Sequence, residues 1–178
     1  MRVMLLRGVW DDNTSWEFVY ASEVPDETLC TAVYCLAVLS EQNAIVLTRN
    51  HRGWEMLGGH IEPDETLEAA MLRECLEEGG FVPEQYRMFG YRKLTSKRPV
   101  RHSQRGGHYP FPVAYIPHFV AVSTRPLQLP HGQDIIEHRA FTISEIRTLK
   151  TEHLPIIHAG LSVYEVMRAA GSSDQLLT

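Results

Sequence analysis

Glu74 stands three residues before Glu77 and four before Glu78, in a stretch whose apolar residues recur with helical spacing. Side chains at these separations share one face of an α-helix, so the three carboxylates are neighbours. Like charges at this spacing repel one another, and a cation between them reverses the sign of the interaction. Converging carboxylate oxygens suit a hard cation such as Mg²⁺ or Mn²⁺. A solvated acidic face is the alternative interpretation, because such clusters are common on helices.

Two neighbouring features favour the metal site over the solvated face. Arg73 precedes Glu77 by four residues, so its guanidinium can hold that carboxylate in place. Gly58 and Gly59 come before the helix, where glycine lets the backbone pass close to a ligand and turn a carbonyl toward a metal. We therefore interpret the acidic face as a predicted metal site.

The surrounding stretch has a fixed pattern of identities. It reads Gly59, five residues, Glu65, seven residues, then Arg73-Glu74-Cys75-Leu76-Glu77-Glu78-Gly79-Gly80-Phe81. This pattern resembles the signature of the Nudix hydrolase family in every fixed position. The family asks for a bulky aliphatic residue where Cys75 stands, and cysteine is small and apolar enough for a buried slot. It also commonly has proline where Leu57 stands.

The resemblance implies an α/β (α+β) fold, an α/β/α sandwich with a mixed central sheet. It also implies a metal-dependent hydrolase that cleaves a diphosphate linkage in a nucleoside diphosphate joined to another group. By carry-over, Glu74, Glu77 and Glu78 are predicted metal ligands, with the Gly58 carbonyl as a further one. The expected cofactor is Mg²⁺, with Mn²⁺ as a second option.

The implied reaction is attack of water on a phosphorus of the diphosphate. A carboxylate that is not fully committed to metal would take the proton. Glu74 and Glu77 are the first choices, with Arg73 beside them. Asp134 and Glu137, near a strand-like segment at 139–143, are candidates from outside the signature.

Predicted substrate contacts are basic. Arg49 ends a strand at a place where relatives put a substrate-contacting arginine, and an exposed surface residue is the alternative. Arg98 and Arg101 lie in a basic run that includes Lys97, His102, Arg105 and His108. Such a loop can reach substrate phosphates, and a solvated, mobile loop is the alternative.

The elements that must position these residues alternate between strands and helices in one predicted domain, residues 1–178. The hairpin of 31–39 and 44–49 is almost continuously apolar, which predicts a sheet covered on both faces. The signature helix is expected over 66–78, capped by Asp64 or Thr66 and ended by Gly79-Gly80. Further strands are expected over 3–6, 17–21, 87–95 and 115–122. Further helices are expected over 145–149, capped by Ser144, and over 156–170, before a loose tail at 171–178.

The composition of the chain limits the kinds of partner that it is expected to bind. The chain has 178 residues, 44% hydrophobic and 22% charged, with a net charge of −5, so general affinity for nucleic acid is not expected. Three cysteines without framework spacing predict reduced thiols in the cytoplasm. No apolar run is long enough to predict a membrane span. Residues 1–29 match no pattern and are expected to form an added edge strand or the contact of a homodimer.

Two rival functions remain. One is a catalytically silent ligand sensor of the same fold, and the other is an isoprenoid diphosphate isomerase. The complete set of signature acids disfavours both. The expected partner is a small nucleotide-like diphosphate. Trp10, Trp16 and Trp54 can each stack on a base, and core packing is the favoured expectation for each.

Overall fold

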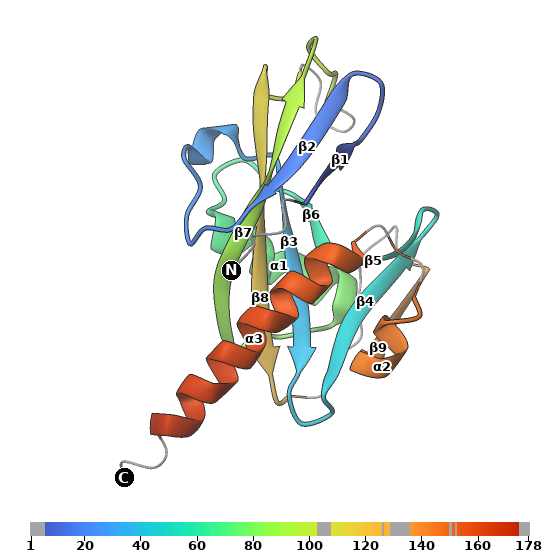
Figure 1. Ribbon diagram of the computed structural model, residues 1–178, viewed down its shortest axis with the longest axis vertical. Coiled ribbons are helices and arrows are strands. Elements are labelled where there is room, and N and C mark those ends of the chain that lie inside the picture. Colours follow the sequence, from blue (N-terminus) through green and yellow to red (C-terminus); the bar gives the residue numbers. More distant parts are fainter. Residues whose placement is uncertain are drawn as a thin grey trace.

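One mixed sheet forms the centre of the molecule, with a helix against each of its faces (Figure 1). The computed structural model describes residues 6–102, 108–125, 127–128, 136–149, 151 and 153–174. The mixed α/β class predicted from the sequence is confirmed. None of the helices in these segments is long and apolar enough to cross a membrane.

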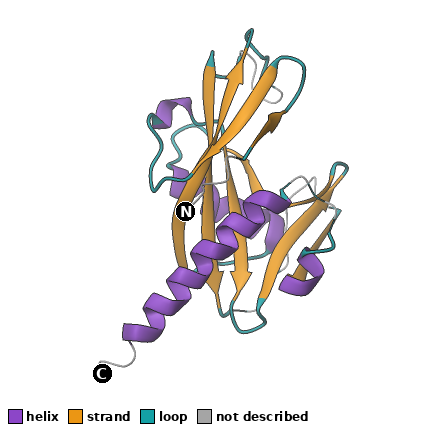
Figure 2. Cartoon of the chain, viewed as in Figure 1, coloured by secondary structure: helices purple, strands orange, loops and turns teal. Residues whose placement is uncertain are grey.

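Strands account for more of the described chain than helices do (Figure 2). The strands are β1 Arg7–Val9, β2 Thr14–Val19, β3 Ala32–Leu39, β4 Ala44–Asn50, β5 Gly53–Glu55, β6 Leu57–His60, β7 Gln85–Ser96, β8 Val113–Ser123 and β9 Glu137–Thr142. The helices are the 3₁₀ turn η1 Glu27–Leu29, α1 Leu67–Gly79, α2 Ile143–Ile146 and α3 Leu154–Asp174. The sheet runs β1-β2-β7-β8-β3-β4-β5, while β6 pairs with β3 and β9 with β4. Among these pairs, β3 and β8 are parallel and the others antiparallel.

The central strand β3 is apolar on both faces, as its sequence predicts. Val33, Cys35 and Ala37 point into the cluster with α1, whereas Leu36 and Val38 point into the cluster with α3. This alternation follows from the two-residue period of a strand. The predicted sheet covered on both faces is therefore confirmed.

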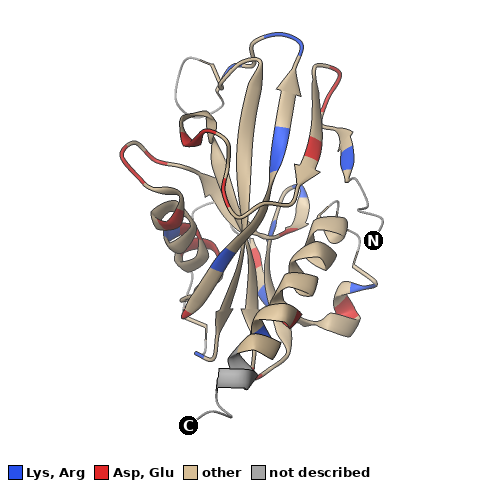
Figure 3. Ribbon diagram, turned by 60° about the vertical axis from the view of Figure 1, so that its left-hand side comes forward, with Lys and Arg blue, Asp and Glu red and all other residues tan. Residues whose placement is uncertain are grey.

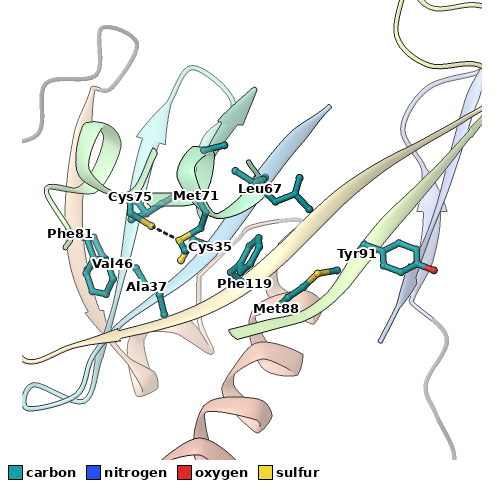
Figure 4. Packing of buried hydrophobic residues seen from close by; sticks show 14 of the residues in the cluster. Cys35, Ala37, Val46, Leu67, Met71, Cys75, Phe81, Met88, Tyr91 and Phe119 are labelled. Carbon is teal, nitrogen blue, oxygen red and sulfur yellow. Dashed lines mark hydrogen bonds between the residues drawn. The ribbon is translucent and has the colours of Figure 1, made fainter. Parts of the chain in front are cut away.

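Helix α1 begins and ends where the sequence predicts. Thr66 is the N-cap, and its side chain accepts a hydrogen bond from the Ala69 N–H at 3.1 Å. Gly80 ends the helix with a φ of 59°, the left-handed conformation that glycine adopts without strain. Cys75 is fully buried and contacts Met71, so the expected apolar slot is confirmed (Figure 4).

Several predicted boundaries were wrong. Strand β2 begins at Thr14 because it pairs with β7 along its whole length. Helix α2 begins at Ile143, since Thr142 and Glu145 form a capping box and Ser144 is not the cap. Helix α3 continues through residues 171–174, which were expected to be loose. The short strands β5 and β6 were not foreseen, and residues 3–5 lie outside the described residues.

His118 is a fully buried histidine on β8, among Phe18, Tyr34 and Phe89. Its Nδ1–H donates to the Ile116 carbonyl at 2.8 Å, and its Nε2 has no hydrogen-bond partner within the described residues. Burial, and then the charge of Arg92, lower the pKa of His118 well below its usual value. The imidazole is therefore neutral in the folded protein.

A His118→Phe variant should lose part of the pH dependence of stability. Because the pKa is lower in the folded than in the unfolded chain, the unfolded chain binds more protons below about pH 6.5, and wild-type stability falls there. The contribution of this one group reaches about 1.4 kcal/mol per pH unit. Urea unfolding of both proteins between pH 8 and pH 5 measures it. A stability difference that does not change with pH would contradict the assignment.

Candidate active site

A cavity of about 730 Å³ joins the acidic face of α1 to the strands beside it. This volume lies within the range of small-molecule sites. Its described wall includes the acids and arginine of α1, namely Arg73, Glu74, Glu77 and Glu78, and both glycines of β6. Figure 3 shows the acidic residues of α1 and of the turn before it gathered on one side of the molecule. The predicted core of the site is therefore brought together in one place.

Arg73 lies at the centre of the charge network. Its Nε and Nη2 donate to the two Glu65 carboxylate oxygens at 2.7 and 2.9 Å, a bidentate pair. Its Nη1 donates to Glu74 at 2.7 Å and to Glu77 at 3.2 Å, and Nη2 also reaches the His60 carbonyl at 2.9 Å. The bonds to Glu65 are the main reason that the pKa of Arg73 is raised further above its usual value. The predicted contact between Arg73 and Glu77 is present.

The three carboxylates differ in burial. The Glu74 side chain is 11% exposed, and burial raises its pKa although Arg73 opposes that shift. Burial also raises the pKa of Glu78 to about 8, while its bond from the Gly58 N–H, 2.8 Å long, acts in the opposite direction. The Glu77 side chain is 37% exposed. Ionisation is therefore costly for the two more buried acids, Glu74 and Glu78.

The donor chemistry fits a divalent cation. All the candidate ligands are oxygens, which Mg²⁺ and Mn²⁺ prefer, and an added positive charge would relieve the crowding of Glu74 and Glu78. Within the described segments, no three acidic, histidine or cysteine side chains are already arranged to hold an ion. Arg73 and the Gly58 N–H now engage these carboxylates, so binding of an ion requires some of them to turn.

The other predicted residues lie away from this cluster. Arg49 and Glu137 form an ion pair of 2.9 Å between β4 and β9, and neither is among the described residues that line the cavity. Arg98 and Arg101 flank Val100, which does line it. Asp134 and Arg105 lie outside the described residues. The roles predicted for these residues stay predictions.

Sequence reasoning did not single out several residues of the wall. Glu55 is buried and accepts two hydrogen bonds from Arg52, at 2.8 and 2.9 Å, which lower its pKa against the effect of burial. His60 and the Tyr109 hydroxyl are 2.8 Å apart. Arg92 lies buried on β7. The three-residue spacing of Arg52 and Glu55 indicates an ion pair and could have been used to predict it. Arg92 lies in a strand with ordinary alternation, and no sequence pattern marks it as part of the site.

The sequence of this chain matches a known protein family. A family model described as the NUDIX domain matches residues 28–160, well over half of the chain. The chain belongs to the Nudix family. With the complete signature in place, it is a Nudix-type diphosphate hydrolase.

Solved structures share the Nudix fold at low identity. The Bacillus subtilis pyrophosphohydrolase BsRppH (an E68A mutant) is 19% identical, with a TM-score of 0.61, covering 89% of this chain and 97% of its own. The NUDIX domain of Shewanella oneidensis NrtR, complexed with ADP ribose, is 15% identical, with a TM-score of 0.58, covering 80% and 94%. No curated protein sequence matches significantly.

The paired glycines of the Nudix signature leave room for the site. A Cβ at Gly59 would lie 2.4 Å from a Glu74 carboxylate oxygen, and one at Gly58 would lie 2.2 Å from the Val33 carbonyl. Both distances are shorter than the van der Waals contact distance of the two atoms. The absence of a side chain at Gly58 therefore lets β6 pair closely with β3, and its absence at Gly59 lets the Glu74 carboxylate lie against β6.

A Gly59→Ala variant should fold and lose activity. The new methyl group would displace the Glu74 carboxylate, and a displacement of about 1 Å at a reacting centre costs about a hundredfold in rate. Turnover of a diphosphate substrate and the thermal unfolding midpoint are the two measurements. Near-normal turnover would show that this position of Glu74 is not the working one.

Proposed function

We propose that this protein hydrolyses the diphosphate linkage of a nucleoside diphosphate joined to another group, with Mg²⁺ or Mn²⁺ as cofactor. The observation that carries the proposal is that Arg73, Glu74, Glu77 and Glu78 together line one 730 Å³ cavity, with Glu65 bonded to Arg73 behind them. The shared fold with a pyrophosphohydrolase and with a domain complexed with ADP ribose is consistent with it.

The oxygens of Glu74, Glu77, Glu78 and the Gly58 carbonyl would hold the cation. When bound, it would neutralise charge on the diphosphate and lower the pKa of the attacking water. Glu77 is the first choice for the group that accepts the water's proton, since its carboxylate is more exposed than that of Glu74 and its contact with Arg73 is the longer one. Glu74 is the second choice.

Arg73 acts as a positioning residue in this proposal. Its two bonds to Glu65 fix the plane of the guanidinium, which then holds Glu74 and Glu77 at set positions. The Gly58 N–H does the same for Glu78. The three described cysteines are all free, which agrees with a reducing compartment such as the cytoplasm.

Glu77→Gln should reduce turnover at least a hundredfold while the fold survives, because the amide removes a negative charge and a proton acceptor. A panel of nucleotide sugars, dinucleotides and nucleotide cofactors with Mg²⁺, followed by detection of the phosphomonoester products, supplies the assay. Glu68→Gln is the matched control, since Glu68 is an exposed acid on the same helix and does not line the cavity. A near-normal rate in the Glu77 variant would remove this residue from the site.

Wild-type protein without turnover on the whole panel, but with saturable binding of one compound, would favour the sensor function instead.

Arg98 and Arg101 are proposed to meet the substrate at the mouth of the cavity, because Val100 between them lines it. The double variant Arg98→Ala/Arg101→Ala should raise KM and leave kcat unchanged, since these side chains lie outside the carboxylate cluster. Arg147→Ala, a change of a distant exposed arginine, is the control. An unchanged KM would contradict this contact.

A further inference from the structure

Trp10 does not have the core position expected for it. Trp10 is 51% exposed, and it lines the same cavity as the α1 acids. Its backbone N–H donates to the Thr14 carbonyl at 2.8 Å, within the tight connection between β1 and β2. A large apolar ring is therefore held in place at the cavity wall with about half of its surface open.

The strands that present Trp10 precede the residues that the family model matches. The family model begins at residue 28, whereas β1 and β2 span residues 7–19. Strand β2 pairs with β7 and extends the sheet, so that the β1–β2 hairpin lies beside the long strands in Figure 1. Trp10, Asp11 and Thr14 of this hairpin all contribute to the cavity wall.

A buried arginine supports the ring from within. Arg92 is 3% exposed, and its guanidinium carbon lies 5.9 Å from the Trp10 ring centroid. It also lies 5.2 Å from the Trp16 ring and 5.7 Å from the Tyr34 ring. These contacts are within cation–π range, so they favour one orientation of the Trp10 ring. The positive charge at this wall also favours an anionic ligand in the cavity.

Trp16 has a different role from Trp10. Its indole packs across Gly8, where a Cβ would lie 2.8 Å from its Nε1, and against the cluster on the α3 side. Trp54 packs edge-on against Phe141. The expectation of core packing therefore holds for Trp16 and Trp54, and Trp10 is the tryptophan that is left to contact a ligand.

We infer that Trp10 is the stacking platform for the nucleobase of the substrate, which makes the β1–β2 hairpin the element that recognises the nucleoside. This inference rests on the proposed function, because the diphosphate joined to that nucleoside lies at the α1 acids of the same cavity. Every nucleobase presents a π-face, so stacking on Trp10 selects for a base without selecting strongly among bases.

The test compares the binding of adenosine 5′-monophosphate and of ribose 5-phosphate, which differ by the base alone. Isothermal calorimetry with Mg²⁺ gives both affinities for the full chain. Wild type should bind the mononucleotide about 5- to 150-fold more tightly, the equivalent of about 1–3 kcal/mol for one stacked base. In Trp10→Ala this preference should vanish, while the affinity for ribose 5-phosphate stays the same.

Two further variants separate stacking from folding. Trp10→Phe should keep most of the preference, since a smaller ring remains. Tyr86→Ala, which removes an aromatic residue of similar exposure that does not line the cavity, should keep all of it. A wild type that binds both ligands equally or binds neither, or a folded Trp10→Ala that keeps the preference, overturns the inference.

The same variants distinguish this failure from failure of the proposed function. Glu77→Gln should abolish turnover and preserve the mononucleotide preference. If the mononucleotide preference depends on Trp10 but the protein turns over no diphosphate, the hydrolase proposal is contradicted and the base-binding site is supported. Turnover with a preference that is indifferent to Trp10 would do the reverse.

Discussion

The arrangement of the site depends on one guanidinium. Arg73 binds Glu65 through two parallel hydrogen bonds and, from the same position, holds Glu74 and Glu77. Several acids that would repel one another are thereby kept within one small volume, because a permanently charged, planar group stands among them. Gly59 of β6 is the second part of the same constraint, since only its missing side chain lets the Glu74 carboxylate approach the strand.

Burial and charge act against each other here, and the balance defines what the site can bind. Glu74 and Glu78 have raised pKa values because they are buried among other acids. Such a site gains from any positive charge that enters it. Arg92, in the wall of the same cavity, supplies a positive charge among aromatic rings. The lining of one cavity therefore combines the acids of α1 with a cation and aromatic side chains from β7 and the β1–β2 hairpin.

The α1 helix and the β3–β4 hairpin were predicted from patterns that are local in sequence, whereas the α2 cap and the long-range contacts were not. The α1 helix, its Thr66 cap and its Gly80 end follow from spacing and capping chemistry, as does the apolar character of β3 and β4. The cap of α2 was missed because Thr142 and Ser144 are both good cap residues, and only the reciprocal bond with Glu145 decides between them. Arg92 could not be foreseen, since its place in the wall depends on β2, β3 and β7 meeting in space.

The parallel pair of β3 and β8 has a consequence for how the molecule forms. Tyr34 is paired with His118, residues that are 84 positions apart in the chain (118 − 34). Closing so long a loop costs entropy before any contact compensates for it, so pairings of this kind slow folding. Strand β3, which carries Tyr34, pairs with β8 only when this loop closes. We therefore expect the cavity, whose wall needs both strands, to form late in folding, although its acidic helix is a local structure.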